Sequence, residues 1–245
     1  MLCPYCSSPR HTLCAAGFNV DVQLSTFDAG ANAAESLCGL AAASAQTHLL
    51  GNQTTNTNAH TDESVLVVLP VFTNTGLGAF GRSICQAFLP QCYRSEPVAT
   101  LHVDGGDFIA HPGQVQFVQL PVPNARRVNV LLVGMGTNIE TFRKNICGLI
   151  GTAIDSAVSG QYAQLVVALS DLTGAQLPGQ QIAATVRCRL STAIVEDKVD
   201  KVLRQLTLVA NSDQVDGICH GIDIQGPLCS NCTHPRAASV RLSTD

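Results

Sequence analysis

The feature that most constrains the fold is a set of continuous apolar runs, each about as long as one β-strand. They cover residues 64–72, 127–134, 164–170 and 204–210. A strand that faces water on one side alternates apolar and polar residues, whereas these runs barely alternate. They are therefore typical of strands that are buried on both faces in a parallel or mixed sheet.

Helical patterns separate these runs. Apolar residues recur at spacings of three and four over 77–92 and 138–158, and we also expect helices over 31–50 and 179–195. Residues 17–27 and 115–120 alternate or are short and apolar, which predicts two further strands. Strands that alternate with helices at this spacing predict an α/β three-layer sandwich around a mixed, mostly parallel sheet. We see no linker, so residues 15–222 are interpreted as one domain.

A motif of the form C-x-x-C-[ST]-x-P-R occurs near each end of the chain. Its cysteines are Cys3 and Cys6 at one end and Cys229 and Cys232 at the other. Each pair supplies half of a tetrahedral zinc shell. Because the termini of a domain are often close together, we predict one structural zinc per chain, bound by all four cysteines in a zinc-ribbon-like site. Segments 1–14 and 223–245 would then be the two halves of this site.

Two other interpretations of these cysteines stay open. They are unpaired structural or surface cysteines, or they form a disulfide or a redox dithiol. The chain has 11 cysteines, an odd number, and no secretory signal pattern, which argues against a secreted disulfide scaffold.

A glycine turn follows the strand 127–134 and precedes a helix. It contains Gly134, Gly136 and Thr137. Backbone N–H groups in such a turn, at the positive end of a helix dipole, form a generic phosphate site, so these three residues are the candidate cofactor-binding residues. The match to G-x-G-x-x-G is incomplete because Ile139 stands at the third glycine position, and glycines at such a turn are also used purely for close packing.

Other candidates for chemistry are weaker. His102 lies near Asp104 and Asp107, but this segment is more typical of a strand end and a turn. Ser170 and Asp171 close a predicted strand at the edge where α/β folds tend to bind ligands, although they also suit a strand cap. No H-E-x-x-H or G-x-S-x-G motif is present, so we predict no catalytic residue.

Composition limits the partners. The net charge is −4 and only 13% of the residues are charged, without a basic stripe, so direct nucleic-acid binding is not expected. An apolar content of 46% with so few charges fits a protein that is covered by other subunits or that self-associates. No apolar stretch is long enough to span a membrane. We expect an intracellular location, with the cytoplasm favoured and a mitochondrion as the alternative.

The order of segments over about residues 64–222 resembles the N-terminal domain of the leucyl (cytosol) aminopeptidase family. The resemblance is carried by Leu66–Phe72, Val128–Gly136, the helix start Thr141-Phe142-Arg143 with Gly148 and Gly151, and Leu206–Val209. It implies a macro-domain-like sandwich that does no chemistry itself and helps to build a hexamer. The family's catalytic half, with its two-metal site, would follow residue 222, and its motifs are absent from this chain.

The sequence leads to three hypotheses about function. The first is a non-catalytic structural or assembly protein derived from an aminopeptidase N-terminal domain, complete in itself and acting as a subunit of a larger intracellular complex. The second is the N-terminal domain or a regulatory subunit of a leucyl aminopeptidase. The third is a macro-like module that binds ADP-ribose or a related nucleotide, for which Asp28 and the residues after Gly30 are a partial match.

Overall fold

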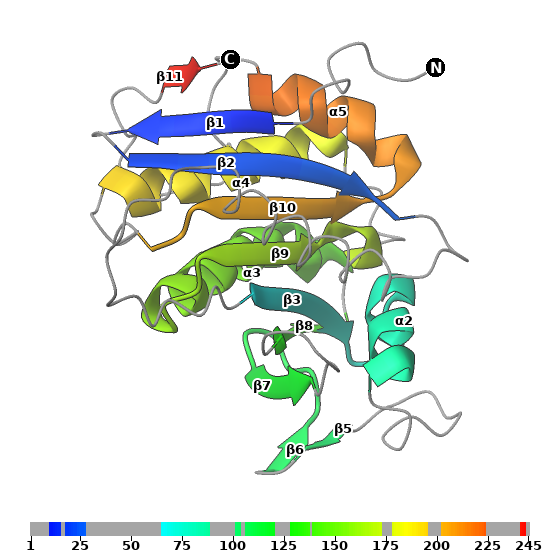
Figure 1. The fold of residues 1–245 in the computed structure, drawn as a ribbon. Helices are drawn as coiled ribbons and strands as arrows, with labels where there is room; N and C mark the ends of the chain where they lie inside the picture. The colour runs from blue at the N-terminus through cyan, green and yellow to red at the C-terminus, as the bar shows by residue number, and fades with distance from the viewer. Residues whose placement is uncertain are drawn as a thin grey trace, which may run out of the picture.

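The computed structural model describes ten stretches of the chain (Figure 1). They are residues 10–15, 18–27, 65–88, 101–103, 106–120, 128–137, 139–172, 178–195, 202–223 and 241–243. The predicted helix at 31–50 lies outside these residues.

The centre of the structure is a nine-stranded mixed sheet with the order β11-β1-β2-β10-β9-β3-β8-β7, with β4 paired to β3. The five strands from β2 to β8 run parallel, while β1, β11, β4 and β7 are antiparallel to their neighbours. A separate hairpin is formed by β5 and β6. The strands are β1 Arg10–Ala15, β2 Phe18–Thr26, β3 Val65–Phe72, β4 Gly76–Leu77, β5 Leu101–Val103, β6 Gly106–Phe108, β7 Val115–Leu120, β8 Val128–Gly136, β9 Gln164–Ala168, β10 Gln205–Ala210 and β11 Arg241–Ser243.

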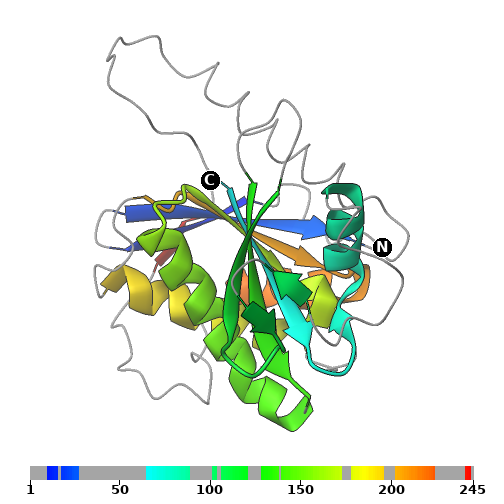
Figure 2. The same ribbon diagram turned by 90° about the horizontal axis from the view of Figure 1, so that it is seen from below.

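Helices cover both faces of this sheet (Figure 2). Three of them, α3, α4 and α5, pack on one face, and α2 packs on the other. A short 3-10 helix, η1, follows β9 directly. The helices are α2 Ala79–Phe88, α3 Ile139–Ser159, η1 Leu169–Leu172, α4 Gly179–Val195 and α5 Ser212–Asp223.

The apolar runs explain this layering because alternate residues of each central strand enter different cores. In β3, Leu66 and Val68 join the core under α3 and α4, whereas Val67 and Leu69 join the core under α2. Every residue from Val65 to Val71 is buried. A strand that contributes to two cores has no polar face, as the continuous apolar pattern predicts.

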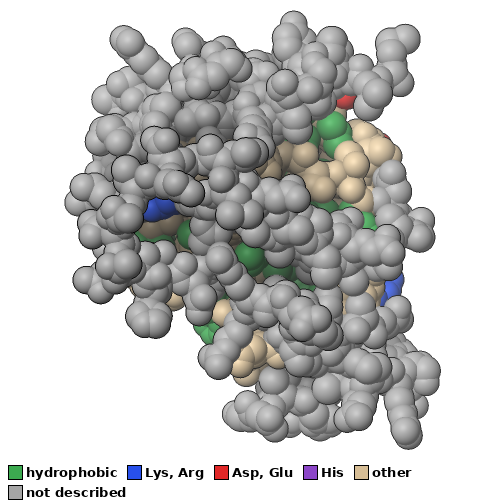
Figure 3. Space-filling model, viewed as in Figure 1, with side chains coloured by type: hydrophobic (Ala, Val, Ile, Leu, Met, Phe, Trp, Pro, Cys, Tyr) green, Lys and Arg blue, Asp and Glu red, His purple; other side chains and the backbone are tan. Residues whose placement is uncertain are grey.

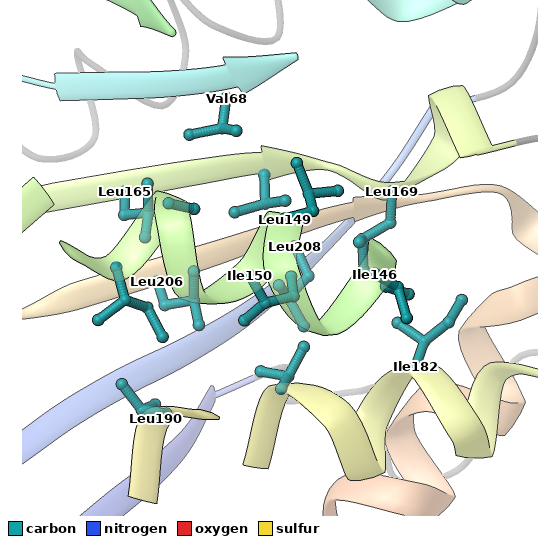
Figure 4. Packing of buried hydrophobic residues seen from close by; sticks show 14 of the residues in the cluster. Val68, Ile146, Leu149, Ile150, Leu165, Leu169, Ile182, Leu190, Leu206 and Leu208 are labelled. Carbon is teal, nitrogen blue, oxygen red and sulfur yellow. The ribbon is translucent and has the colours of Figure 1, made fainter. Parts of the chain in front are cut away.

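The larger core lies between α3, α4 and the parallel strands (Figure 4). Leu149 and Ile150 of α3 point toward Leu206 and Leu208 of β10, and Ile146 lies beside Ile182 of α4. Full burial of one such side chain contributes about 1.5 to 3 kcal/mol. The stripe at spacings of three and four is therefore enough to hold α3 on the sheet.

The predicted α/β fold with a mixed sheet around a parallel centre is confirmed. Strand β1 begins at Arg10, inside the segment that we interpreted as half of a zinc site, and it extends the same sheet. No helix in the described part of the chain is long and apolar enough to cross a membrane.

Candidate functional site

The carboxyl ends of β3 and β9 form the natural ligand edge of this sheet. These two strands are neighbours, but the chain leaves β3 toward β8, and it leaves β9 through α4 toward β10. Connections that depart in opposite directions from adjacent parallel strands mark a topological switch point, where open α/β sheets usually bind ligands. In Figure 1 these ends lie beside α2.

A buried carboxylate lies at this edge. Asp171, in η1, is only 3% exposed. Its Oδ1 accepts a hydrogen bond of 2.8 Å from the backbone N–H of Phe80, and its Oδ2 accepts one of 2.8 Å from the N–H of Gly81. Both donors belong to the first turn of α2, whose N–H groups have no partner within the helix. Asp171 therefore caps a helix about 90 positions earlier in the sequence and attaches it to the end of β9.

Burial dominates the electrostatics of this carboxylate. Desolvation raises the pKa of Asp171 from 3.8 to about 6, although the hydrogen bonds from Gly81 and Phe80 and the positive charge of Arg82 lower it. Since both oxygens already accept backbone N–H groups, the geometry assigns Asp171 to holding α2 in place. A Cβ at Gly78 would overlap the Asp171 side chain, so this close approach needs a glycine there.

One polar atom at the same edge has no partner. The Ser170 side chain is 4% exposed, and its Oγ is the only buried side-chain oxygen or nitrogen without a hydrogen bond among the described residues. Asn211, at the end of β10, donates from Nδ2 to the Ser170 carbonyl oxygen at 3.4 Å. A buried hydroxyl that bonds no protein atom can bond a water or a ligand atom.

The predicted phosphate turn lies at the end of β8. The N–H of Gly134 donates to the Gln114 carbonyl oxygen at 2.7 Å, and that of Gly136 donates to Ala110 at 3.0 Å. A Cβ at Gly134 would overlap the His111 carbonyl oxygen. The two glycines thus let the segment 110–114 pack against β8, and their amides are already used. Thr137 is exposed, and phosphate binding here stays a prediction.

The four predicted zinc ligands, Cys3, Cys6, Cys229 and Cys232, lie outside the described residues. Within the described part, no group of three or more metal-binding side chains occurs. Strands β1 and β11 do pair, with Cys14 opposite Arg241.

A second candidate site is an exposed apolar surface at the edge of the sheet. Ile109, Val115 and Phe117 are 37%, 43% and 49% exposed, and they are the only exposed large hydrophobic side chains among the described residues. We call them the β7 surface. Val118, with the opposite orientation in the strand, packs against the core under α2. Val115 and Phe117 therefore face the side that α3, α4 and α5 cover elsewhere, where no described helix covers them.

The described side chains on the face that α2 occupies are mostly uncharged (Figure 3). Hydrophobic side chains lie across the middle of this face, and the described charged side chains on it are few and scattered. The sequence predicted β7 with its correct bounds, but it did not indicate that its apolar residues would be exposed. The alternation in 115–120 was the available signal, because Val115 and Phe117 lie on the same face of this strand as the polar Gln119.

Comparison with known proteins gives a structural similarity only. No family model and no curated protein matches the chain. A search of solved structures finds a point mutant of the Oceanobacillus iheyensis macrodomain, with 13% sequence identity and a TM-score of 0.47, over 86% of this chain and 95% of that chain. These values assign neither a family nor a ligand, so the relation to the aminopeptidases stays a prediction.

Proposed function

We propose that this protein is a non-catalytic assembly module that joins a larger protein complex through the β7 surface. The observation that carries the proposal is that Val115 and Phe117 are exposed on one face of the edge strand β7, while Ile109 is exposed in the segment before it. Exposed apolar side chains that gather in one place are typical of protein–protein contacts.

The energetics favour a modest contact at this surface. Covering the exposed half of Phe117 and of Val115 would contribute about 1 kcal/mol each. Residues at the rim of an interface usually add little, so an aromatic side chain at its centre would dominate the affinity. Phe117 is accordingly the residue whose replacement should matter most.

Two further parts of the proposal rest on the sequence. One is a structural zinc bound by Cys3, Cys6, Cys229 and Cys232, which would fix both ends of the domain without chemistry. The other is descent from an aminopeptidase N-terminal domain in an intracellular protein. The alternative, a subunit of an active aminopeptidase, would require peptidase activity to co-purify with this chain.

The test is site-specific photo-cross-linking in the cells that make the protein. A photoreactive phenylalanine analogue at Phe117 should give a covalent product heavier than the free chain. The matched control is the same analogue at Gln180. This exposed residue lies in the first turn of α4, on the face of the sheet that α3, α4 and α5 cover. Absence of any product specific to position 117 would refute the assembly function.

The unpartnered hydroxyl of Ser170 favours a second candidate, a small-ligand site at the carboxyl edge of β9. In this case the ligand class would be ADP-ribose or a related nucleotide, and Ser170 and Asn211 would line the site. Calorimetric titration with ADP-ribose tests it: heat of binding that disappears in Ser170→Ala supports a ligand site, and no heat with the wild-type protein rejects it.

A further inference from the structure

We infer that the partner seated on the β7 surface is a second copy of this chain, paired strand to strand through β7 about a twofold axis at Phe117. This inference rests on the proposed function, because it names the partner of the same surface.

The ladder between β7 and β8 shows which backbone groups of β7 point outward. The N–H of Gly134 donates to the carbonyl oxygen of Gln114, one position beyond the register pair Val115 and Val133. In an antiparallel pair, hydrogen-bonded and non-hydrogen-bonded positions alternate. Residues 116, 118 and 120 therefore bond to β8, and Val115, Phe117 and Gln119 direct their N–H and C=O groups to the outer edge.

No described strand pairs with that outer edge. An antiparallel copy of β7 centred on Phe117 would place Phe117 opposite its counterpart and Val115 opposite Gln119 of the copy. Every outward group of these three residues then has a partner, because they occupy the hydrogen-bonded positions of the new ladder. The two Phe117 rings would lie side by side on one face, as cross-strand aromatic pairs do.

The absence of charge favours a second copy as the occupant. Edge strands of monomeric proteins usually carry a charge, a proline or a bulge that prevents pairing with another edge. In β7 a glycine bulge at Gly113 and Gln114 lies directly before the strand, whereas residues 115–120 themselves contain no Asp, Glu, Lys, Arg, Gly or Pro. Two identical strands that bear charges repel each other, whereas two copies of this strand approach without repulsion, although each chain has a net charge of −4. A charged partner would find no complementary group here.

The experiment uses charge exchange at position 117. At about 10 to 200 μM, light scattering after size-exclusion chromatography should give the wild type a mass of about twice 25.7 kDa. Phe117→Lys alone and Phe117→Glu alone should be monomeric, because like charges meet at the axis. An equimolar mixture of the two should restore a dimer that contains one chain of each kind. Gln180→Lys is the control and should remain dimeric.

A second variant tests the backbone ladder. Phe117→Pro removes an N–H that points outward and leaves the bonds to β8 intact, so the protein should fold and be monomeric. Phe117→Leu keeps this N–H and should dimerise.

The outcomes distinguish the twofold β7 pairing from the assembly function. A wild type that is monomeric throughout the range, or a mixture of charge variants that does not pair, overturns the twofold β7 pairing. If position 117 still cross-links to a different protein in cells, the assembly function survives without it. If neither a dimer nor a cross-link forms, both fail.

Discussion

Replacing Asp171 by asparagine tests whether burial or hydrogen bonding has the larger effect on the pKa of the carboxyl group that caps α2. Asparagine has nearly the same shape as a protonated aspartic acid and does not ionise. Because burial raises the pKa of Asp171 to about 6, the folded state holds this proton more tightly than the unfolded state does. The stability that Asp171 contributes is therefore fully present below pH 3.8 and is lost as the pH rises through about 6.

The size of the effect follows from these two pKa values. Between pH 7 and pH 5, protonation of Asp171 should increase the free energy of unfolding of the wild type by about 1.3 kcal/mol. Urea unfolding of the wild type and Asp171→Asn at both pH values measures this change, because the effects of other titrating groups cancel in the difference between the two proteins. From pH 7 to pH 5, the free energy of unfolding of the wild type should rise by about 1.3 kcal/mol relative to that of the variant.

The control is Asp155→Asn, because it makes the same exchange of aspartate for asparagine at an exposed position on α3. If the difference in stability between the wild type and Asp171→Asn did not change with pH, or if the wild type gained stability at pH 7 instead, the two amide hydrogen bonds would outweigh burial and our reasoning would be wrong.

Three further outcomes are expected. Gly134→Ala should lower the free energy of unfolding by roughly 2 to 4 kcal/mol, because its Cβ would overlap a backbone carbonyl, whereas Gly148→Ala, with open space around it in α3, should be neutral or stabilising in the same denaturation assay. Elemental analysis should find about one zinc per chain. The double variant Cys229→Ser/Cys232→Ser should lose this zinc and several kcal/mol of stability, and an unchanged melting temperature would contradict the zinc site. Cys147 is half-buried beside the Arg189 guanidinium and should react with iodoacetamide faster than the buried Cys188 and Cys219, as peptide mapping would show.

The sequence predicted the parallel centre of the sheet well, because each central strand feeds two cores. The run at 64–72 became β3, and the run at 127–134 became most of β8. The helices at 138–158 and 179–195 correspond to α3 and α4 within one residue. Helix α5 was not predicted, since its two glycines lower the helical signal; one of them, Gly217, is needed for close contact with Gly179 of α4.

The polar contacts at the carboxyl edge could not be predicted in the same way. Ser170 and Asp171 were placed at the correct edge, but the partner of Asp171 is a helix about 90 positions upstream. Only the folded chain shows that this carboxylate caps α2. Likewise, Gly134 and Gly136 form a turn signal that fits both an anion site and close packing, and the signal does not reveal that Gln114 and Ala110 accept their N–H groups.

The position of β2 in the sheet has a consequence for how this chain folds during synthesis. Its parallel partner is β10, and Gln205 of β10 donates a side-chain hydrogen bond to Gln23 of β2 across 182 positions. At ordinary translation rates, β2 waits roughly 10 to 40 seconds before this partner leaves the ribosome. Strand pairs that are so distant along the chain also close slowly. Until β10 emerges, β2 of the nascent chain is paired only with β1, and its other edge is open. This open edge makes the β1–β2 hairpin a candidate for chaperone binding during that interval.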